Sequence, residues 1–98
     1  MVKTTDGYHL YVYHIWDKSK NGIPVFMQHG LFSSGDTWMV NRAKSPAVIA
    51  AKAGYDVWIG NNRGSKYSRG HDTLDPNRDF KAFFDYSFFE LGLYDAPA

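Results

Sequence analysis

The stretch PVFMQHGLFSSGDTWMVNRAKSPAVIAAKAGYDVWIG, residues 24–60, decides the fold. It begins with the short apolar run PVFMQ over residues 24–28, which is typical of a strand buried on both faces, as in a parallel sheet. A second run of this kind, YDVWI over residues 55–59, precedes Gly60 at the end of the stretch. With a helix between them, two such strands form a βαβ unit, so we expect parallel strands and a right-handed crossover.

The residues between the two strands predict one short helix. Ser45 is a preferred N-cap residue, and Pro46 suits the first helical position because its φ is fixed and its missing N–H is not needed there. The segment AVIAAKA follows over residues 47–53, and Gly54 stands where a left-handed residue ends a helix. Residues 31–38, LFSSGDTW, contain Ser, Gly and Asp and are expected to form a loop.

A hairpin is predicted ahead of this unit. Asp6-Gly7 is a strong turn pattern, and the run YHLYVYHI over residues 8–15 alternates between two faces, with aromatic and β-branched residues that favour a strand. Only residues 2–5 of the partner strand precede the turn, so the chain is expected to open partway through the hairpin. The polar segment DKSKNG, residues 17–22, is expected to form a loop.

The remaining residues predict little regular structure. Residues 61–79 form a long loop in this interpretation, which points to function or to packing against further chain. Aromatic residues at helical spacing predict a short helix within residues 80–93, ending before Asp95. A βαβ unit needs cover on both faces of its sheet, and two short helices are too few. Residues 1–98 are therefore interpreted as the incomplete N-terminal part of one larger α/β domain.

Composition excludes several classes of protein. The 98 residues carry 11 Lys and Arg against 10 Asp and Glu, a net charge of +1 that gives no reason to expect a nucleic acid partner. Seven Phe, seven Tyr and three Trp argue against disorder, and the lack of cysteine excludes disulfide scaffolds and thiolate sites. No apolar run approaches the roughly 20 residues that span a bilayer, and the first residues contain no secretory h-region.

The first candidate site follows the strand at residues 24–28. His29 and Gly30 lie beyond the carboxyl end of that strand, at the edge where α/β proteins bind ligands. In serine hydrolases with a strand–elbow–helix nucleophile, a loop at this place supplies one backbone N–H of the oxyanion hole. The alternative is that Gly30 only makes a turn and that His29 is a packed core residue. The dipeptide alone leaves both interpretations open.

The second candidate site follows the strand at residues 55–59. Asn61, Asn62 and Gly64 tolerate the tight left-handed conformations found where a strand turns into a loop. Arg63 carries five donors, enough to bind several loop carbonyls or a carboxylate. These properties favour a structural role for the loop over direct catalysis.

Taken together, four segments resemble the acid lipase family of α/β-hydrolases, which contains gastric and lysosomal acid lipases. The resemblance extends from about Thr4 to Ala98, and its most specific element is GYDVWIGNNRG followed by YSRGH. It implies the N-terminal part of an α/β-hydrolase sheet, with an antiparallel hairpin strand followed by a βαβ unit. The segments are GYHLYVYHI (7–15), PVFMQHGLFSSGDTW (24–38), AGYDVWIGNNRGSKYSRGH (53–71) and FFELGLYDAPA (88–98).

The resemblance also implies an activity. Members of the family are lipases and esterases that cleave triacylglycerols or sterol esters with a Ser-His-Asp triad and no cofactor. By position, Leu31 would supply an oxyanion-hole N–H, His29 and Gly30 would shape that loop, and Asn61–Gly64 would be structural. The implied partners are a lipid ester substrate and a lipid–water interface, and the implied location is secreted or lysosomal.

One part of the family pattern is missing. No G-x-S-x-G occurs, so the 98 residues contain no nucleophile elbow, and Ser33 and Ser34 lack the geometry that an elbow provides. In this fold the catalytic acid and His follow the nucleophile along the chain, so all three triad members are expected beyond Ala98. The chain alone is therefore expected to be inactive. No triad role is expected for His9, His14, His29 and His71.

Other functions are less well supported. The segment from Gly30 to Gly35 has the spacing G-x-x-x-x-G, but Asp36 stands where a phosphate-binding loop needs Lys, and its carboxylate would repel phosphate. No G-x-G-x-x-G supports a dinucleotide, and His9 and His14 are expected on opposite faces of a strand, which disfavours a metal site. A truncated, non-catalytic homologue that binds lipid or a partner, or an incomplete gene model, stays as the alternative because the nucleophile motif is absent.

Overall fold

The computed structural model describes residues 1–98 and divides them into two compact units. One unit consists of Val12–Gly60, and the other combines Met1–Tyr11 with Asn61–Ala98. No helix in either unit combines the length and the apolar character that crossing a bilayer requires.

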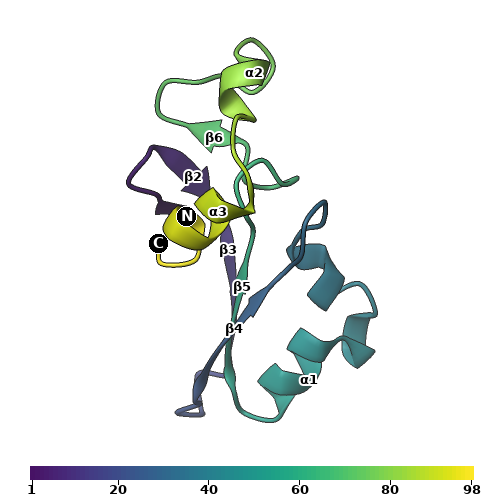
Figure 1. The fold of residues 1–98 in the computed structure, drawn as a ribbon. Helices are drawn as coiled ribbons and strands as arrows, with labels where there is room; N and C mark the ends of the chain where they lie inside the picture. The colour runs from purple at the N-terminus through teal and green to yellow at the C-terminus, as the bar shows by residue number, and fades with distance from the viewer. The chain divides into compact units, whose positions relative to one another are not determined.

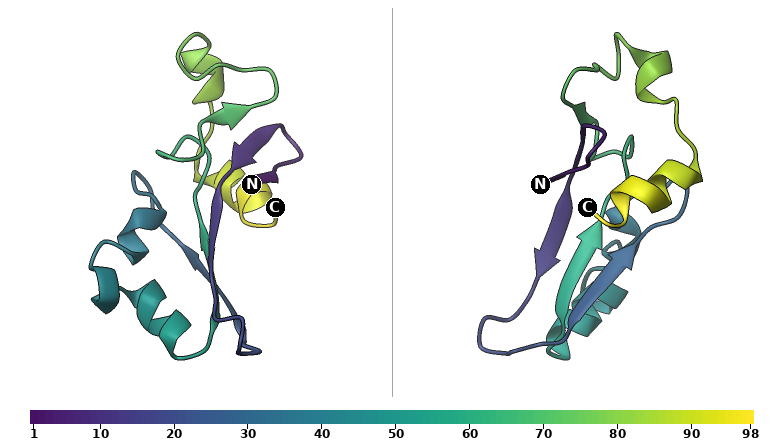
Figure 2. Two further views of the ribbon diagram at one scale, coloured as in Figure 1. Left: turned by 180° about the vertical axis from the view of Figure 1, so that it is seen from behind. Right: turned by 60° about the vertical axis from the view of Figure 1, so that its left-hand side comes forward.

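The Val12–Gly60 unit is a three-stranded sheet with one α-helix beside it (Figures 1 and 2). Its strands are β3 (Val12–Ile15), β4 (Pro24–Gln28) and β5 (Asp56–Gly60), in the order β3-β5-β4. β4 and β5 run parallel, from the pair Pro24–Asp56 to the pair Gln28–Gly60, and β3 is antiparallel to β5. The predicted βαβ unit with parallel strands is therefore confirmed.

Helix α1, Pro46–Lys52, has the predicted ends. Ser45 occupies the N-cap position with Pro46 in the first turn, although the buried Ser45 hydroxyl makes no capping hydrogen bond. Gly54 has a φ of +99° and donates its N–H to the Ala51 carbonyl at 3.0 Å, while the Tyr55 N–H reaches the Ala50 carbonyl at 3.1 Å. These two bonds form a Schellman motif, which requires the left-handed conformation that Gly54 supplies. Two 3₁₀ turns, η1 (Gly35–Trp38) and η2 (Arg42–Lys44), precede the helix.

The core of this unit lies between α1 and one face of the sheet. Ala47 and Ala51 of the helix pack with Val57 and Ile59 of β5, all four of them buried. The opposite face is open, because Phe26 of β4 is 53% exposed. The prediction that residues 24–28 are buried on both faces is therefore wrong for this structure. β4 pairs only with β5, and α1 covers one face alone.

The second unit contains a small antiparallel sheet in the order β1-β2-β6. Its strands are β1 (Val2–Lys3), β2 (Tyr8–Leu10) and β6 (Gly70–His71). The predicted hairpin joins β1 to β2, and the Thr4 N–H donates to the Tyr8 carbonyl at 2.9 Å across the turn. β6 lies within residues 61–79, which were predicted to form only a loop.

The predicted strand over residues 8–15 is broken at Tyr11. The Tyr11 N–H donates to the Ser68 hydroxyl at 3.0 Å, and its carbonyl accepts from the Asn61 side-chain amide at 2.9 Å. Side chains thus bind the backbone groups of Tyr11 at the point where one strand ends and another begins. The run supplies β2 to one unit and β3 to the other.

The single helix predicted within residues 80–93 is also wrong. The structure has three short elements, namely α2 (Phe80–Phe83), α3 (Phe88–Glu90) and the π-helical turn η3 (Leu91–Asp95). Ser87 separates α2 from α3 because it forms a capping box, in which its hydroxyl accepts from the Phe89 N–H and Glu90 accepts from the Ser87 N–H. The helical segment continues through Asp95 rather than ending before it.

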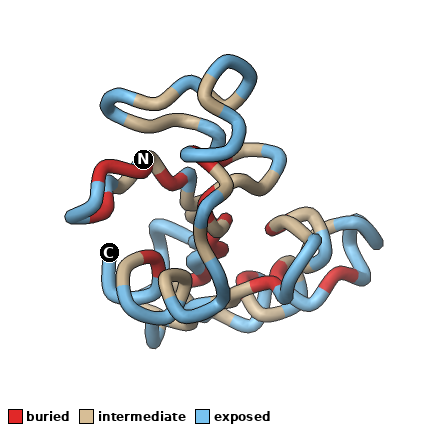
Figure 3. Tube along the Cα trace, turned by 45° about the horizontal axis from the view of Figure 1, so that its top comes forward, coloured by how far each residue is buried: buried red, intermediate tan, exposed pale blue.

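An aromatic cluster forms the core of this unit. Tyr8, Leu10 and Phe83 are buried together, and the Tyr8 hydroxyl donates to the Phe83 carbonyl at 2.6 Å. Figure 3 marks the buried residues of the N-terminal hairpin in red near the label N. The Tyr8 ring lies 5.2 Å from the Phe83 ring and 6.0 Å from the Tyr86 ring, so these contacts attach α2 and the segment after it to β2.

Candidate functional site

The loop that follows β4 begins with a buried histidine. His29 is 7% exposed, and its Nδ1 lies 2.8 Å from the Gly30 carbonyl oxygen. A carbonyl can only accept, so this contact makes Nδ1 the protonated nitrogen of the ring. A Cβ added at Gly30 would meet no atom within 4 Å. The loop is therefore held by a hydrogen bond at His29, and the space beside the Gly30 backbone is unoccupied.

The tip of the loop exposes apolar side chains and a free backbone donor. Leu31 is 61% exposed, and Phe32 is fully exposed with a left-handed φ of +57°. The Leu31 N–H donates no hydrogen bond to the backbone of the chain. Because Gln28 at the end of β4 pairs with Gly60 at the end of β5, this tip follows the carboxyl edge of the parallel strands. An unbonded N–H at that edge is available to an acceptor from outside the chain.

The two serines after the tip are engaged in the next turn. The Ser33 hydroxyl lies 2.6 Å from the Thr37 hydroxyl, and the Ser34 hydroxyl accepts from the Asp36 N–H as the N-cap of η1. Both residues lie in the loop that leads into a 3₁₀ turn, and neither is at a strand-to-helix elbow. Their place in the structure gives them the role of anchoring the loop.

The loop that follows β5 is built around a buried cation. The Arg63 side chain is 1% exposed and donates from Nε to Asp95 at 2.7 Å. Its two terminal nitrogens donate to the two carboxylate oxygens of Asp6 at 2.7 and 2.9 Å. The backbone N–H of Arg63 also donates to Asp95, at 2.7 Å. One guanidinium thus joins the N-terminal hairpin to the C-terminal turn η3.

Aromatic rings enclose the same guanidinium. The Arg63 Cζ lies 4.0 Å from the centre of the Tyr8 ring, and the rings of Tyr86 and Tyr94 lie 5.7 and 5.5 Å away. The Tyr86 hydroxyl donates to the Arg63 carbonyl at 2.9 Å. Gly64 has a φ of +72°, and a Cβ there would collide with the Tyr86 hydroxyl. This packing leaves the loop no room for a side chain at Gly64.

The buried charges of this cluster shift one another's pKa. Burial raises the pKa of the Asp95 carboxyl above its ordinary value, although the hydrogen bonds from Arg63 oppose the rise. Burial acts in the same direction on Asp6, but there the hydrogen bonds from Arg63 outweigh it and lower the pKa of the carboxyl. Burial would lower the pKa of Arg63, and the hydrogen bonds to Asp6 and Asp95 raise it instead. Arg63 therefore stays protonated and paired.

The two asparagines of this loop lie beside Arg63. Asn61 is buried, donates its side-chain amide to the Tyr11 carbonyl, and accepts from the Ser68 hydroxyl at 2.8 Å through its backbone oxygen. The Asn62 carbonyl accepts from the Ser65 N–H at 3.1 Å. The Gly64 N–H donates to the Ser68 carbonyl at 2.7 Å and closes the loop. Backbone and side-chain groups of this loop are thus engaged within the chain.

Three of the histidines make hydrogen bonds with other residues of the chain. His9 Nε2 lies 2.9 Å from Asp72, which also binds Lys3. His71 Nδ1 lies 3.1 Å from the N–H groups of Thr73 and Leu74 and accepts from them. His14 is bound to Asp56. No group of three or more His, Cys, Asp or Glu side chains is placed to hold a metal ion.

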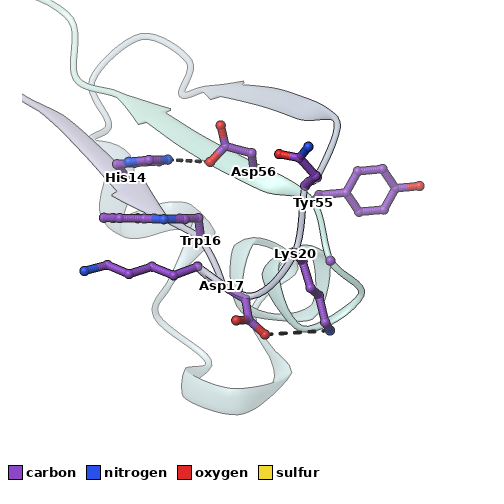
Figure 4. Close-up of a pocket in the computed structure, with 10 residues that line it drawn as sticks. His14, Trp16, Asp17, Lys20, Tyr55 and Asp56 are labelled. Atoms are coloured by element: carbon purple, nitrogen blue, oxygen red, sulfur yellow. Dashed lines mark hydrogen bonds and ion pairs between the residues drawn. The ribbon is translucent and has the colours of Figure 1, made fainter.

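A cavity of about 390 Å³ lies at the amino end of β5, away from the loop after β4 (Figure 4). His14 and Trp16 line it, and the His14 ring stacks on Trp16 at 4.1 Å and on Trp58 at 3.7 Å, with the ring planes within 12° of parallel. Asp56 accepts from His14 and, at 3.0 Å, from the Trp58 indole N–H. This stack was not predicted from the sequence, although His14 and Trp16 alternate along one strand and Trp58 lies opposite His14 on the paired strand.

The comparisons with known proteins agree on one family. The family model described as "Partial alpha/beta-hydrolase lipase region" matches residues 1–42. Triacylglycerol lipase 1 of Arabidopsis thaliana is 43% identical over 98 residues, which cover 96% of this chain and 24% of that protein. Lipase 1 of Drosophila melanogaster is 46% identical over 99 residues, covering 99% of this chain and 21% of the relative.

One of the similar proteins is a human lipase whose name places it in the lysosome. The lysosomal acid lipase/cholesteryl ester hydrolase of Homo sapiens is 41% identical over 105 residues, covering 100% of this chain and 26% of that protein. The chain thus spans about a quarter of the length of these relatives. Both kinds of comparison agree with the resemblance carried by the four sequence segments. The chain is thus similar, along its whole length, to the acid lipases among the α/β-hydrolases.

Proposed function

We propose that this chain is the N-terminal part of a serine ester hydrolase that acts on triacylglycerols or sterol esters. The observation that carries the proposal is the Leu31 N–H, which has no backbone acceptor and lies on an exposed loop at the carboxyl edge of the parallel strands. The relatives support the substrate class, since their names include a triacylglycerol lipase and a cholesteryl ester hydrolase.

In this mechanism Leu31 supplies one donor of the oxyanion hole. A serine hydroxyl attacks the ester carbonyl carbon, the electron pair of the C=O bond moves to oxygen, and the Leu31 N–H hydrogen-bonds to the resulting anion. The triad His takes the proton of the serine hydroxyl and gives it to the leaving oxygen, so collapse of the tetrahedral intermediate expels the alcohol and leaves an acyl-enzyme, which water then hydrolyses. A donor of this kind contributes about 3–4 kcal/mol to the transition state.

His29 and Gly30 position this donor. The buried His29 ring bonds the Gly30 carbonyl, which fixes the peptide that precedes the tip. Gly30 adds no side chain above the edge, so an ester can approach the backbone closely. The Asn61–Gly64 loop is assigned a structural role, because the Arg63 guanidinium is bound by two carboxylates and its side chain is only 1% exposed.

The triad is assigned to chain beyond Ala98. The 98 residues contain no G-x-S-x-G, and in this fold the acid and the His follow the nucleophile. Residues 1–98 alone should therefore show no ester hydrolysis, and they form one part of a single catalytic domain. The whole enzyme is expected to act without a cofactor at a lipid–water interface and to be secreted or lysosomal, as the lysosomal relative suggests.

The second candidate is a non-catalytic homologue that binds lipid or a partner. Residues 1–98 contain no nucleophile motif, so this part of the chain is compatible with both candidates. The two candidates make different demands on the full-length protein, because only a hydrolase needs a reactive serine. A single experiment that labels a reactive serine therefore distinguishes the two candidates.

The test uses the full-length protein and a serine-directed fluorophosphonate. A hydrolase should cleave triacylglycerol and sterol ester emulsions, and one equivalent of the reagent should abolish both activities while labelling a serine within G-x-S-x-G beyond residue 98. Heat-denatured protein is the control for non-specific labelling. A folded protein that binds lipid but neither hydrolyses the esters nor reacts with the reagent would establish the non-catalytic candidate instead.

A further inference from the structure

Phe32 combines a strained backbone with a fully exposed ring. Its φ of +57° lies in the left-handed region, which is unfavourable for a bulky residue without the freedom of glycine. Its relative exposure is 108%, so the ring buries no surface against the chain. Burial of an aromatic side chain is among the largest contributions to folding, and this ring makes none of it here.

The residues on both sides of Phe32 are held by hydrogen bonds. On one side, buried His29 is bonded to the Gly30 carbonyl. On the other side, the Ser33 and Thr37 hydroxyls are 2.6 Å apart, and Ser34 caps η1. The tip between these anchors spans only Leu31 and Phe32, and both side chains are exposed. A strained residue that is held in place and contributes nothing to packing is typical of a site that acts on a ligand.

The ring is adjacent to the donor assigned to the oxyanion. Consecutive Cα atoms are about 3.8 Å apart, so an ester whose carbonyl oxygen accepts from the Leu31 N–H places the first carbons of its acyl chain within reach of the Phe32 side chain. The ring packs against nothing within residues 1–98, and an acyl chain bound at that point would bury part of its apolar surface.

We propose that Phe32 is a specificity-determining residue whose ring packs against the acyl chain of the bound ester. This inference rests on the proposed function and adds the part of the substrate that the loop tip recognises. The left-handed backbone at Phe32 serves to present the ring beside the donor. Val40 is the matched control, since it is 70% exposed in the same unit but lies outside the loop.

The experiment measures kcat/KM of the full-length enzyme on p-nitrophenyl esters from acetate to octanoate, dissolved as monomers. The leaving group is constant, so only the acyl chain varies, and monomeric esters exclude adsorption to an interface. Phe32→Ser should lower the ratio of kcat/KM on octanoate to kcat/KM on acetate on the order of tenfold, because each buried methylene is worth about 0.8 kcal/mol. Phe32→Leu should retain most of the wild-type preference for octanoate over acetate, and Val40→Ser should retain all of that preference.

The outcomes separate this inference from the proposed function. If the wild-type enzyme is active and Leu31→Pro abolishes that activity, but Phe32→Ser keeps the wild-type chain-length profile, only the role of Phe32 is overturned. An equal loss on acetate and octanoate, or a loss seen on emulsions alone, overturns it as well. If the wild-type protein hydrolyses none of the esters, the proposed function fails and this inference fails with it. Melting temperatures of all variants verify that each is folded.

Discussion

The loops after β4 and β5 each follow the carboxyl end of a parallel strand, yet their polar groups are used differently. In the loop after β5, Arg63 is buried and bound by Asp6 and Asp95. In the loop after β4, the Leu31 N–H has no backbone acceptor, and both residues of the tip are exposed. Groups that are satisfied within the chain stabilise the fold, whereas an unbonded donor held at the edge of a sheet is free to act on a substrate.

The largest expected effect is the loss of stability when Arg63 is removed. Arg63→Met in the full-length protein leaves the carboxylates of Asp6 and Asp95 without their cation, and Asp95 is 2% exposed. The free energy of unfolding should fall by about 3–5 kcal/mol. Denaturant titration measures this change, and Arg78→Met, at an exposed residue, should leave the midpoint nearly unchanged. A normal stability combined with a large loss of kcat would instead make this loop catalytic.

A pair of glycine substitutions compares the two loops directly. Gly64→Ala forces a Cβ against the Tyr86 hydroxyl at a φ of +72°, so it should lower the free energy of unfolding by about 1–3 kcal/mol. Gly30→Ala adds a methyl group that meets nothing within 4 Å, and its effect should stay within about 0.5 kcal/mol. Denaturant titration of both variants checks the comparison. Equal destabilisation would mean that the loop after β4 is packed as tightly as the other.

The next prediction concerns the pH dependence of stability at Asp56, which lies at the amino end of β5, outside both loops. The hydrogen bonds from His14 and then Trp58 lower the pKa of Asp56, so the stabilisation that this carboxylate provides is complete above its unfolded pKa, about 3.9 for Asp. It is lost as the pH falls through the lower, folded value.

Asp56→Asn should therefore lower the melting temperature near neutral pH, and the gap to wild type should narrow below about pH 4. Differential scanning calorimetry across this range makes the measurement. Asp17→Asn is the comparison: hydrogen bonds from Ser19 also lower the pKa of this carboxyl, but its removal leaves the stack of His14 on the two Trp rings intact, so the difference between the two variants isolates the stack. A gap that widens on acidification would contradict the assignment.

The smallest expected effect concerns the strain at Phe32. Phe32→Gly and Phe32→Ala both remove the exposed ring, but only glycine adopts a φ of +57° freely. The glycine variant should be more stable than the alanine variant by about 0.5–1 kcal/mol, after the greater freedom of glycine in the unfolded chain is included. Chemical denaturation of the two proteins gives this difference. Equal stabilities would show that the tip carries no strain.

Local sequence patterns were sufficient to predict the βαβ unit. Ser45-Pro46 and Gly54 mark the ends of α1 through short-range rules, and two apolar runs mark β4 and β5. The resemblance to acid lipases in turn predicts Leu31 as the oxyanion donor from the sequence alone.

Long-range contacts explain what the sequence analysis missed. The strand break at Tyr11 depends on Asn61 and Ser68, and the ion cluster of Arg63 joins carboxylates 57 and 32 positions away along the chain. No short-range pattern encodes such pairings. The prediction that β4 is buried on both faces failed for a different reason. An apolar run indicates that a strand can be covered on both faces, but it does not say which elements cover it.

The kcat of Leu31→Pro beside Leu31→Ala, in the full-length enzyme on a short-chain ester, tests most directly whether the loop after β4 supplies the oxyanion donor. Proline removes the N–H and alanine keeps it, so the pair separates the backbone donor from the exposed side chain. We expect kcat to fall about a hundredfold or more for the proline variant and to stay within a few-fold of wild type for the alanine variant. A folded Leu31→Pro enzyme that hydrolyses the ester at the wild-type rate would contradict the assignment.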